Sequence, residues 1–303
     1  MKEAFLAVVN PAAGAGRCGR LAGAALDELR KAGIAIEKVE SGGPEDATRL
    51  ARDAYQAGYR RFIAVGGDGT SFEIINGLFP AAEAAATDQR PTLAFLPLGT
   101  GNSFLRDFTE RGAEYAKESL LAGRRRSCDV IRLRHREGVL YYMNLLSIGF
   151  PADVAALTNR RFKSLGELGY LLGILVCLIR LRRRAFPHRV DDEREMDRRP
   201  CLFLTFNNSQ FTGGKMRIAP QASSGDGLIE CVRWGPIGRA GLIANLHRLY
   251  DGSHVNHPLA SRRAARRIEF DLTGTVDIMV DGEVQRAHCQ LLEILPAALQ
   301  VMA

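Results

Sequence analysis

Short apolar runs alternate with helical patterns in the first third of the chain. The apolar runs cover residues 4–9, 34–40, 62–65 and 92–96, and the helical patterns cover residues 21–32, 45–57 and 71–79. This alternation predicts a parallel sheet with helices on both faces, a three-layer α/β sandwich. Gly33 and Gly58 come just after two of the predicted helices, where a left-handed backbone often ends a helix. We therefore expect an α/β domain over residues 1–129.

The pattern changes after Asp129. Apolar runs at 130–133, 139–148, 201–207, 228–234, 267–271 and 276–281 are separated by turns rather than by regular helices. This favours a second domain over residues 130–289, a mainly antiparallel β-sandwich. Two helical insertions are expected in it, at 161–184 and 237–250, and the charged segment 188–200 is expected to be a solvated turn or loop. The C-terminal segment, about 290–303, is expected to pack back on the first domain.

Composition adds limits to this picture. The chain has 303 residues, of which 46% are hydrophobic and 25% charged, as in a folded protein of two ordinary domains. Its six cysteines form no C-x-x-C pair, so neither a zinc site nor a disulfide framework is indicated, and reduced thiols fit a cytoplasmic protein. The apolar run at 168–179 is too short to span a bilayer.

Positive charge is in excess, with 41 Lys and Arg against 34 Asp and Glu. Clusters lie at 124–126, 182–184 and 262–267. Such clusters favour a polyanionic partner, which could be a nucleic acid, an anionic membrane or a polyphosphate, but they also occur as solvated faces. Charge alone does not choose among these.

Glycine-rich loops follow three of the predicted parallel strands. Gly14, Gly16 and Gly19 fit G-x-G-x-x-G, which is compatible with a dinucleotide site or a structural turn, although a phosphate-binding loop of unspecified type is favoured. The second loop runs from Gly66 to Thr70 and the third from 97 to 102. The carboxyl ends of parallel strands share one edge, so the three loops should converge on one phosphate-binding crevice, where Asp68 could act on Mg²⁺. No Walker A motif occurs.

Together with Asn10-Pro11 and with Glu73, Asn76 and Gly77 after the second loop, these motifs resemble the diacylglycerol kinase catalytic family, which includes sphingosine kinases and bacterial soluble lipid kinases. The segments 211–220, 226–228 and 281–283 resemble the bacterial branch in order and spacing. The resemblance implies a Rossmann-like, phosphofructokinase-like first domain and an ATP- and Mg²⁺-dependent lipid kinase. The expected acceptor is the hydroxyl of diacylglycerol or a related glycerolipid or sphingolipid.

The resemblance also implies roles for individual residues. Glu283 corresponds to the general base, and Asp68 and Asp129 would organise the catalytic Mg²⁺. A second, structural Mg²⁺ is implied at Ser223, Asp226 and Leu228, although an ordinary Asp-Gly hairpin also explains that sequence. The residues implied in ATP binding are Asn10, Pro11, Ala12, Ala13, Gly14, Ser41, Gly66, Gly67, Asp68, Gly69, Thr70, Glu73 and Thr100. Ala12 and Ser103 depart from the lysine and aspartate common in relatives.

A peripheral membrane enzyme on the inner face of the membrane is the resulting expectation, with a lipid substrate and no nucleic acid partner. The sequence does not fix the oligomeric state, and the resemblance suggests a homodimer. The basic and apolar stretch 160–184 could sit on an anionic bilayer or be buried against the β domain. An NAD kinase and a non-catalytic nucleotide- or lipid-binding regulator remain alternatives, and an oxidoreductase is the more distant one.

Overall fold

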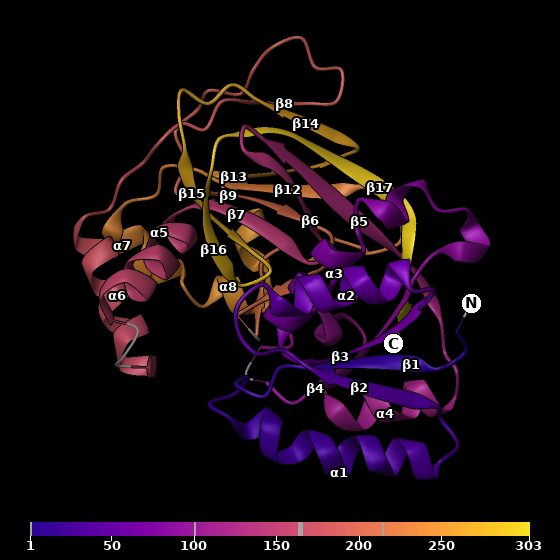
Figure 1. Cartoon of the computed structure of the whole chain (residues 1–303). Helices are drawn as coiled ribbons and strands as arrows, with labels where there is room; N and C mark the ends of the chain where they lie inside the picture. The colour runs from indigo at the N-terminus through magenta and orange to yellow at the C-terminus, as the bar shows by residue number, and fades with distance from the viewer. Residues whose placement is uncertain (1, 100, 163–165, 214) are drawn as a thin grey trace.

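The computed structural model describes residues 2–99, 101–162, 166–213 and 215–303. It has two lobes joined along one side (Figure 1). The first lobe contains four parallel strands in the order β2, β1, β3, β4, namely β2 (Ile36–Glu40), β1 (Phe5–Val9), β3 (Arg61–Gly66) and β4 (Thr92–Pro97). Helices α1 (Arg17–Lys31) and α4 (Ala113–Leu121) lie on one face, with α2 (Asp46–Gln56) and α3 (Asp68–Leu78) on the other. The predicted three-layer α/β architecture is therefore confirmed.

Two glycines end helices of this lobe as expected. Gly33 follows α1 with φ +93, and Gly58 follows α2 with φ +94. A side chain is strained in this left-handed region, so glycine lets the chain turn sharply toward β2 and β3.

The second lobe is built from antiparallel strands in two layers. One layer is a six-stranded sheet in the order β13 (Ala260–Ala265), β12 (Ile229–Trp234), β9 (Phe203–Asn207), β7 (Leu145–Gly149), β15 (Val276–Val280) and β16 (Glu283–Ala287). The other continues the sheet of the first lobe through β17 (Cys289–Met302), β14 (Arg267–Phe270) and β8 (His188–Val190), with β5 (Arg126–His135) and β6 (Gly138–Tyr142) paired beside β17. The mainly antiparallel β-sandwich is thus also confirmed.

The second lobe also contains a small hairpin and helices outside its two main sheets. A short hairpin is formed by β10 (Phe211–Thr212) and β11 (Met216–Arg217). The helices are α5 (Phe150–Leu157), α6 (Gly166–Ile179), α7 (Arg239–Asn245) and α8 (Arg248–Asp251). Within the described residues, no helix combines the length and apolarity that crossing a membrane requires.

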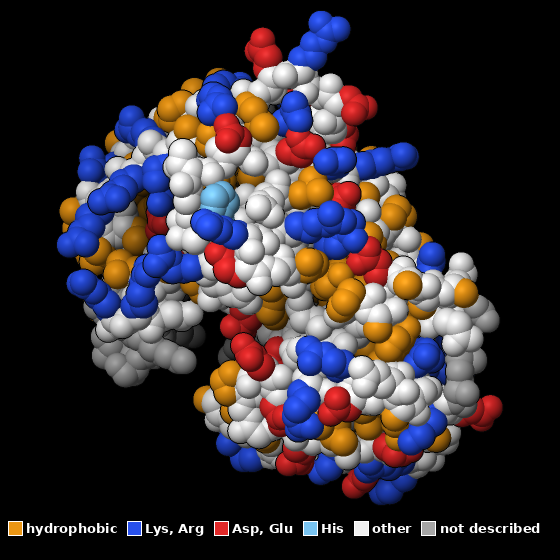
Figure 2. Space-filling model, turned by 45° about the horizontal axis from the view of Figure 1, so that its top comes forward, with side chains coloured by type: hydrophobic (Ala, Val, Ile, Leu, Met, Phe, Trp, Pro, Cys, Tyr) orange, Lys and Arg blue, Asp and Glu red, His pale blue; other side chains and the backbone are white. Residues whose placement is uncertain are grey.

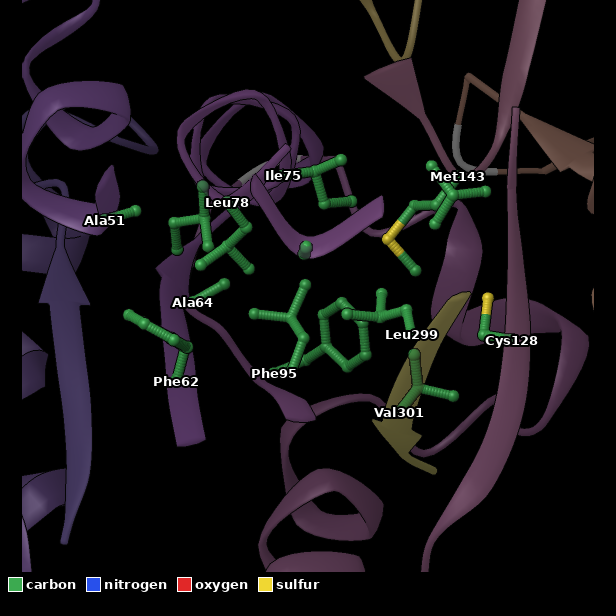
Figure 3. Close-up of a cluster of buried hydrophobic side chains, with 14 of the residues drawn as sticks. Ala51, Phe62, Ala64, Ile75, Leu78, Phe95, Cys128, Met143, Leu299 and Val301 are labelled. Atoms are coloured by element: carbon green, nitrogen blue, oxygen red, sulfur yellow. The ribbon is translucent and has the colours of Figure 1, made fainter. Parts of the chain in front are cut away.

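The last strand ties the lobes together. β17 pairs antiparallel with β5 and β14 in the second lobe, and its end, Gln300–Met302, pairs parallel with β4. The register of β17 on β5 shifts between Leu295 and Leu299, where the strand bends from one lobe into the other. One buried cluster follows the same route: Figure 3 shows Phe62 and Phe95 of the first lobe with Leu299, Cys128 and Met143 at the junction.

The structure corrects four of the predicted elements. The run 139–148 is two strands, β6 and β7, which join different sheets, and the segment 188–200 contains β8. The insertion at 237–250 is two helices, and the described part of the one at 161–184 contains α6, which is shorter than predicted and follows the unpredicted α5. Apolar runs mark buried backbone, but the partner strand that ends or redirects a run lies far away in sequence.

Candidate functional site

The second and third glycine loops touch each other at the carboxyl edge of the parallel sheet. The N–H of Asp68 donates to the Gly101 carbonyl at 3.1 Å, and the N–H of Gly99 donates to the Gly66 carbonyl at 2.9 Å. A Cβ on Gly67 would lie 2.9 Å from the Gly101 oxygen, so only glycine permits this approach. Thr100 lies outside the described residues.

Asp68 is the first residue of α3 and its carboxylate faces the third loop. Both carboxylate oxygens accept the N–H of Ser103, at 3.0 and 2.9 Å. Burial raises the pKa of Asp68, against the lowering effect of hydrogen bonds from Ser103 and Phe104. Ser103 therefore binds Asp68 through its backbone N–H.

The first glycine loop lies at the same edge, between β1 and α1. The Asn10 side chain accepts the N–H of Ala12 at 3.1 Å, and this turn carries the chain through Pro11 and Ala13 to Gly14. A Cβ on Gly14 would lie 3.1 Å from the Leu98 carbonyl, so the first loop also reaches the third. Ser41, which follows β2, is buried, and both its N–H and its hydroxyl donate to the Val9 carbonyl, at 2.9 and 3.3 Å.

Glu283 reaches this edge from the second lobe. It begins β16, and its Oε1 lies 2.5 Å from the position that a Cβ on Gly69 would take. The carboxylate therefore lies against the second glycine loop, and the absence of a side chain at residue 69 makes room for it. Two residues, Asp281 and Gly282, link β15 to β16 with φ 47 and φ 91, as in a tight type I′ hairpin.

Asp281 holds this hairpin in place, and sequence reasoning gave it no role. It is 3% exposed, and its carboxylate accepts the N–H groups of Met143, Asn144 and Leu145 at 2.9–3.1 Å. Burial raises the pKa of Asp281 to about 7, and the nearby charge of Asp68 adds to the rise, although the three N–H donors oppose it. An aspartate on a tight turn gives no sign of such distant partners, so only the motif 281–283 could have drawn attention to it.

A second carboxylate that sequence reasoning missed bridges the lobes near the β10–β11 hairpin. Asp107 ends the 3-10 helix η3 (Phe104–Asp107) and accepts the N–H of Gln210 at 3.0 and 3.2 Å. Gln210 in turn accepts the Nε–H of Arg217 at 2.8 Å. Burial raises the pKa of Asp107 to about 7, while the charge of Arg217 lowers it.

Glu73 has a structural task. Its carboxylate accepts the N–H of Glu45 at 3.2 Å and of Ala47 at 3.1 Å, and its carbonyl accepts the Thr48 hydroxyl at 3.0 Å. The side chain thus caps the N-terminus of α2 from α3. In this way it fixes the helix that follows Ser41 against the helix that begins at Asp68.

Asp129 shares its surroundings with Asp226 rather than with the glycine loops. Its carboxylate accepts the N–H of Gly227 and of Ala297, each at 2.7 Å, and burial raises its pKa. Ala297 lies in the bend of β17, so Asp129 pins that bend to the 225–228 turn. Asp226 accepts the Leu228 N–H at 3.0 Å, and Ser223 is exposed beside this turn. Among the described residues, no group of three or more His, Cys, Asp and Glu side chains is arranged to hold a metal.

The glycine loops fit the phosphates of a nucleotide. Loops that follow β1, β3 and β4 lie against one another at positions where a Cβ would crowd backbone atoms, and α3 begins at the same edge, so the positive end of its dipole lies there. Within the described residues the hydroxyl of the buried Thr70 has no hydrogen-bond partner. Asp281 lies near enough to Asp68 for the charge of Asp68 to raise the pKa of Asp281, and carboxylate oxygens such as theirs are the ligands that Mg²⁺ prefers.

The chain is similar to known lipid kinases along most of its length. The family model described as diacylglycerol kinase catalytic domain matches residues 4–133, and the one described as YegS C-terminal NAD kinase beta sandwich-like domain matches residues 144–303. A diacylglycerol kinase of Mycobacterium tuberculosis is 26% identical over 98% of this chain and 94% of its own length. A YegS-like lipid kinase of Chromohalobacter salexigens is 37% identical over 68% of this chain and 64% of its own length. A solved Bacillus anthracis structure described as a diacylglycerol kinase superposes with a TM-score of 0.70 at 19% identity, covering 99% of this chain and 96% of its own, and so shares the fold.

Proposed function

This chain belongs to the diacylglycerol kinase family and is a lipid kinase, and from that membership we propose that it uses ATP and Mg²⁺ to phosphorylate the hydroxyl of a membrane lipid. Diacylglycerol is the leading candidate for the acceptor, and related glycerolipids and sphingolipids present the same alcohol. The observation that carries the proposal is the contact of Glu283, from one lobe, with Gly69 in the glycine loop of the other.

The residues around the glycine loops divide the chemistry between them. Bound ATP with Mg²⁺ would supply the transferable phosphoryl group and neutralise its charge. Backbone N–H groups of the loops after β1, β3 and β4 would hold the phosphates. Asp68 would hold the metal at the start of α3, at the same edge of the sheet.

Glu283 would take the proton of the acceptor alcohol. It is exposed at the start of β16, directly after the two-residue turn, so an alcohol can approach it from solvent or from a bilayer. A general base in this position makes the alcohol oxygen a better nucleophile as it attacks phosphorus. Water access to the exposed carboxylate also lets the proton leave afterwards.

We also propose roles for two groups of residues beside the main site. Ser41 and Glu73 lie next to the nucleotide edge but are bound to backbone of their own lobe, so we assign them the support of that edge. Ser223, Asp226 and Leu228, with Asp129 beside them, could hold a structural Mg²⁺ through carbonyl and carboxylate oxygens.

A labelled-ATP assay tests the main proposal. The acceptors are diacylglycerol, phosphatidylglycerol, sphingosine and ceramide in mixed micelles, with NAD as a soluble acceptor. We expect transfer to a lipid, and a loss in kcat of about 10²–10⁴ for Glu283→Gln with little change in ATP affinity, because a general base acts only on the chemical step. Asp68→Ala should lose both rate and Mg²⁺ dependence.

The matched control is Glu137→Gln, an exposed carboxylate on the turn between β5 and β6, which should keep full activity. Transfer to NAD alone would replace the proposal with an NAD kinase. ATP binding without transfer to any acceptor would favour a non-catalytic regulator.

A further inference from the structure

Three helices on one flank of the second lobe carry apolar side chains on two faces. Their inner residues pack on the core around Trp234, and these are Leu178 of α6, Leu242 of α7 and Leu249 of α8. The residue directly after each of them points outward: Ile179 is 62% exposed, Ile243 61% and Tyr250 55%. Leu175 and Leu246 are also exposed, by 52% and 48%. A helix that is apolar on its outer face as well needs a second apolar environment.

These outer side chains belong to one surface. The Arg239 side chain at the start of α7 donates to the carbonyls of Leu178 at 3.0 Å and Ile179 at 2.6 Å, so α7 begins where α6 ends (Figure 1). Arg239 and Ile243 are four residues apart within α7, so they lie on the same side of that helix, and the exposed Leu246 and Tyr250 follow in the turn after α7 and in α8. We call this surface, with Leu175 and Ile179 of α6, the α6–α8 face.

The charge of the α6–α8 face is mainly positive. Residues 172–184 and 237–250 contain six arginines and no aspartate or glutamate, and an acidic residue, Asp251, follows at the end of α8. Within the described part of the chain, Arg180, Arg182, Arg183 and Arg248 form no ion pair with an acidic side chain, whereas Arg184 pairs with Asp153 at 2.6 Å. Figure 2 shows Lys and Arg side chains interspersed with hydrophobic ones on this flank of the molecule, beside the grey segment.

We propose that the α6–α8 face docks the protein on a bilayer that contains anionic phospholipids. The exposed apolar side chains would enter the interface between headgroups and acyl chains, and the arginines around them would contact phosphate groups. At 14 residues, α6 is too short to span a membrane and so lies along it. The benefit of docking rests on the proposed function, because it would bring the lobe that carries Glu283 to a lipid acceptor, but docking itself requires no catalysis.

The charge argues against a second copy of this chain as the occupant. In a two-fold dimer through this surface the same patch would meet itself, so arginines would face arginines with no acidic side chain in residues 172–184 and 237–250 to separate them. An anionic bilayer instead supplies the missing negative charge together with an apolar phase.

Vesicle flotation without ATP tests the proposal. The vesicles are phosphatidylcholine alone or phosphatidylcholine with about 30% phosphatidylglycerol, an anionic content chosen so that arginine contacts add to apolar insertion. We expect binding to the anionic vesicles, and at least about a tenfold loss of the partition coefficient for Ile179→Ser/Ile243→Ser and for Arg182→Ser/Arg183→Ser, since each pair removes surface that enters the interface. The matched controls are Leu121→Ser/Val139→Ser, at 52% and 49% exposure elsewhere on the molecule, and Arg52→Ser/Arg125→Ser.

Two measurements make the outcome decisive. All variants change exposed residues, so their thermal midpoints should match the wild type. Wild-type vesicle binding by either face variant, or equal loss in the controls, would overturn the proposal. So would a wild-type dimer, seen by light scattering, that becomes monomeric in the face variants while vesicle binding stays unchanged.

An activity assay separates this inference from the proposed function. A short-chain diacylglycerol that is dissolved as monomers needs no docking, so the face variants should phosphorylate it at the wild-type rate. Vesicle binding that depends on the α6–α8 face, without transfer to any lipid, would leave docking standing and remove the kinase proposal. Transfer to a lipid, with vesicle binding that does not depend on the α6–α8 face, would remove the docking proposal alone.

Discussion

Asp281 shows how one buried carboxylate positions another that is exposed. Its three backbone hydrogen bonds attach the β15–β16 hairpin to the turn between β6 and β7, and the next residue but one is Glu283. The left-handed backbone at Asp281 and Gly282 leaves this hairpin little freedom. The location of Glu283 against Gly69 therefore depends on Asp281, whose carboxylate binds residues 143–145 rather than a glycine loop.

Asp281→Ala should weaken both the fold and the reaction. We expect the free energy of unfolding to fall by about 2–4 kcal/mol, because three buried N–H groups lose their acceptor. We also expect kcat to fall by about 10–100-fold with the KM for ATP nearly unchanged, since the base would be displaced and the nucleotide edge would not. Urea denaturation and initial rates measure the two effects.

The control on the same hairpin is Asp277→Ala. Its carboxylate pairs with Arg160 at 3.2 Å near the surface, so less than about 1 kcal/mol should be lost. If Asp281→Ala lost stability but kept the full kcat, Asp281 would be structural only and would not position Glu283.

At the scale of elements, the nucleotide edge depends on how α2 and α3 meet. Glu73 caps α2 from α3, and a Cβ on Gly77 would lie 2.2 Å from the Thr48 carbonyl, so the two helices pack with no space between them. This packing sets the direction in which α3 presents Asp68 and its first N–H groups. Glu73 can therefore influence nucleotide binding without contacting the nucleotide.

Glu73→Ala should cost about 1–2 kcal/mol of unfolding free energy, the usual effect of losing a helix cap. Glu73→Gln should keep part of the stability that the cap contributes, since the amide oxygen still accepts one N–H. Asp53→Ala, an exposed position on α2, is the control and should be within about 0.5 kcal/mol of the wild type. A large rise in the KM for ATP at unchanged stability would show instead that Glu73 binds the nucleotide directly.

How far the sequence predicts these elements depends on the distance between partners. The strands of the first lobe, its helices α1 to α3 and the ends at Gly33 and Gly58 follow from local pattern and were predicted closely, whereas α4 was not predicted. The break between β6 and β7 was not predicted, because the turn there is held by hydrogen bonds to Asp281, which is 136–138 residues away in the sequence. The glycine loops were found from their motifs, but Asp107 and Asp281 were not, since their importance lies in burial and in partners from other elements.

At the scale of the whole molecule, the two lobes share structure and not only a boundary. β17 belongs to the sheet of both, and the Asn76 side chain of α3 exchanges hydrogen bonds with the Tyr141 backbone of β6 at 2.8 and 2.9 Å. The space-filling view shows the surface notched between the lobes, with acidic side chains on the wall (Figure 2). A base from one lobe can face a nucleotide on the other only if the shared strand and these hydrogen bonds keep the two lobes in a fixed orientation.

Leu299→Ala tests whether the lobes unfold together. Leu299 is fully buried in the cluster that also contains Phe95 of the first lobe and Met143 at the junction (Figure 3), so its truncation should cost about 2–5 kcal/mol. Far-UV circular dichroism reports the helices of both lobes, whereas fluorescence reports Trp234, the one tryptophan, buried in the second. Both signals should move to the same lower urea midpoint. The exposed α1 variant Leu21→Ala should move neither, and a fluorescence midpoint left in place by Leu299→Ala would mean that the second lobe holds its fold without the shared core.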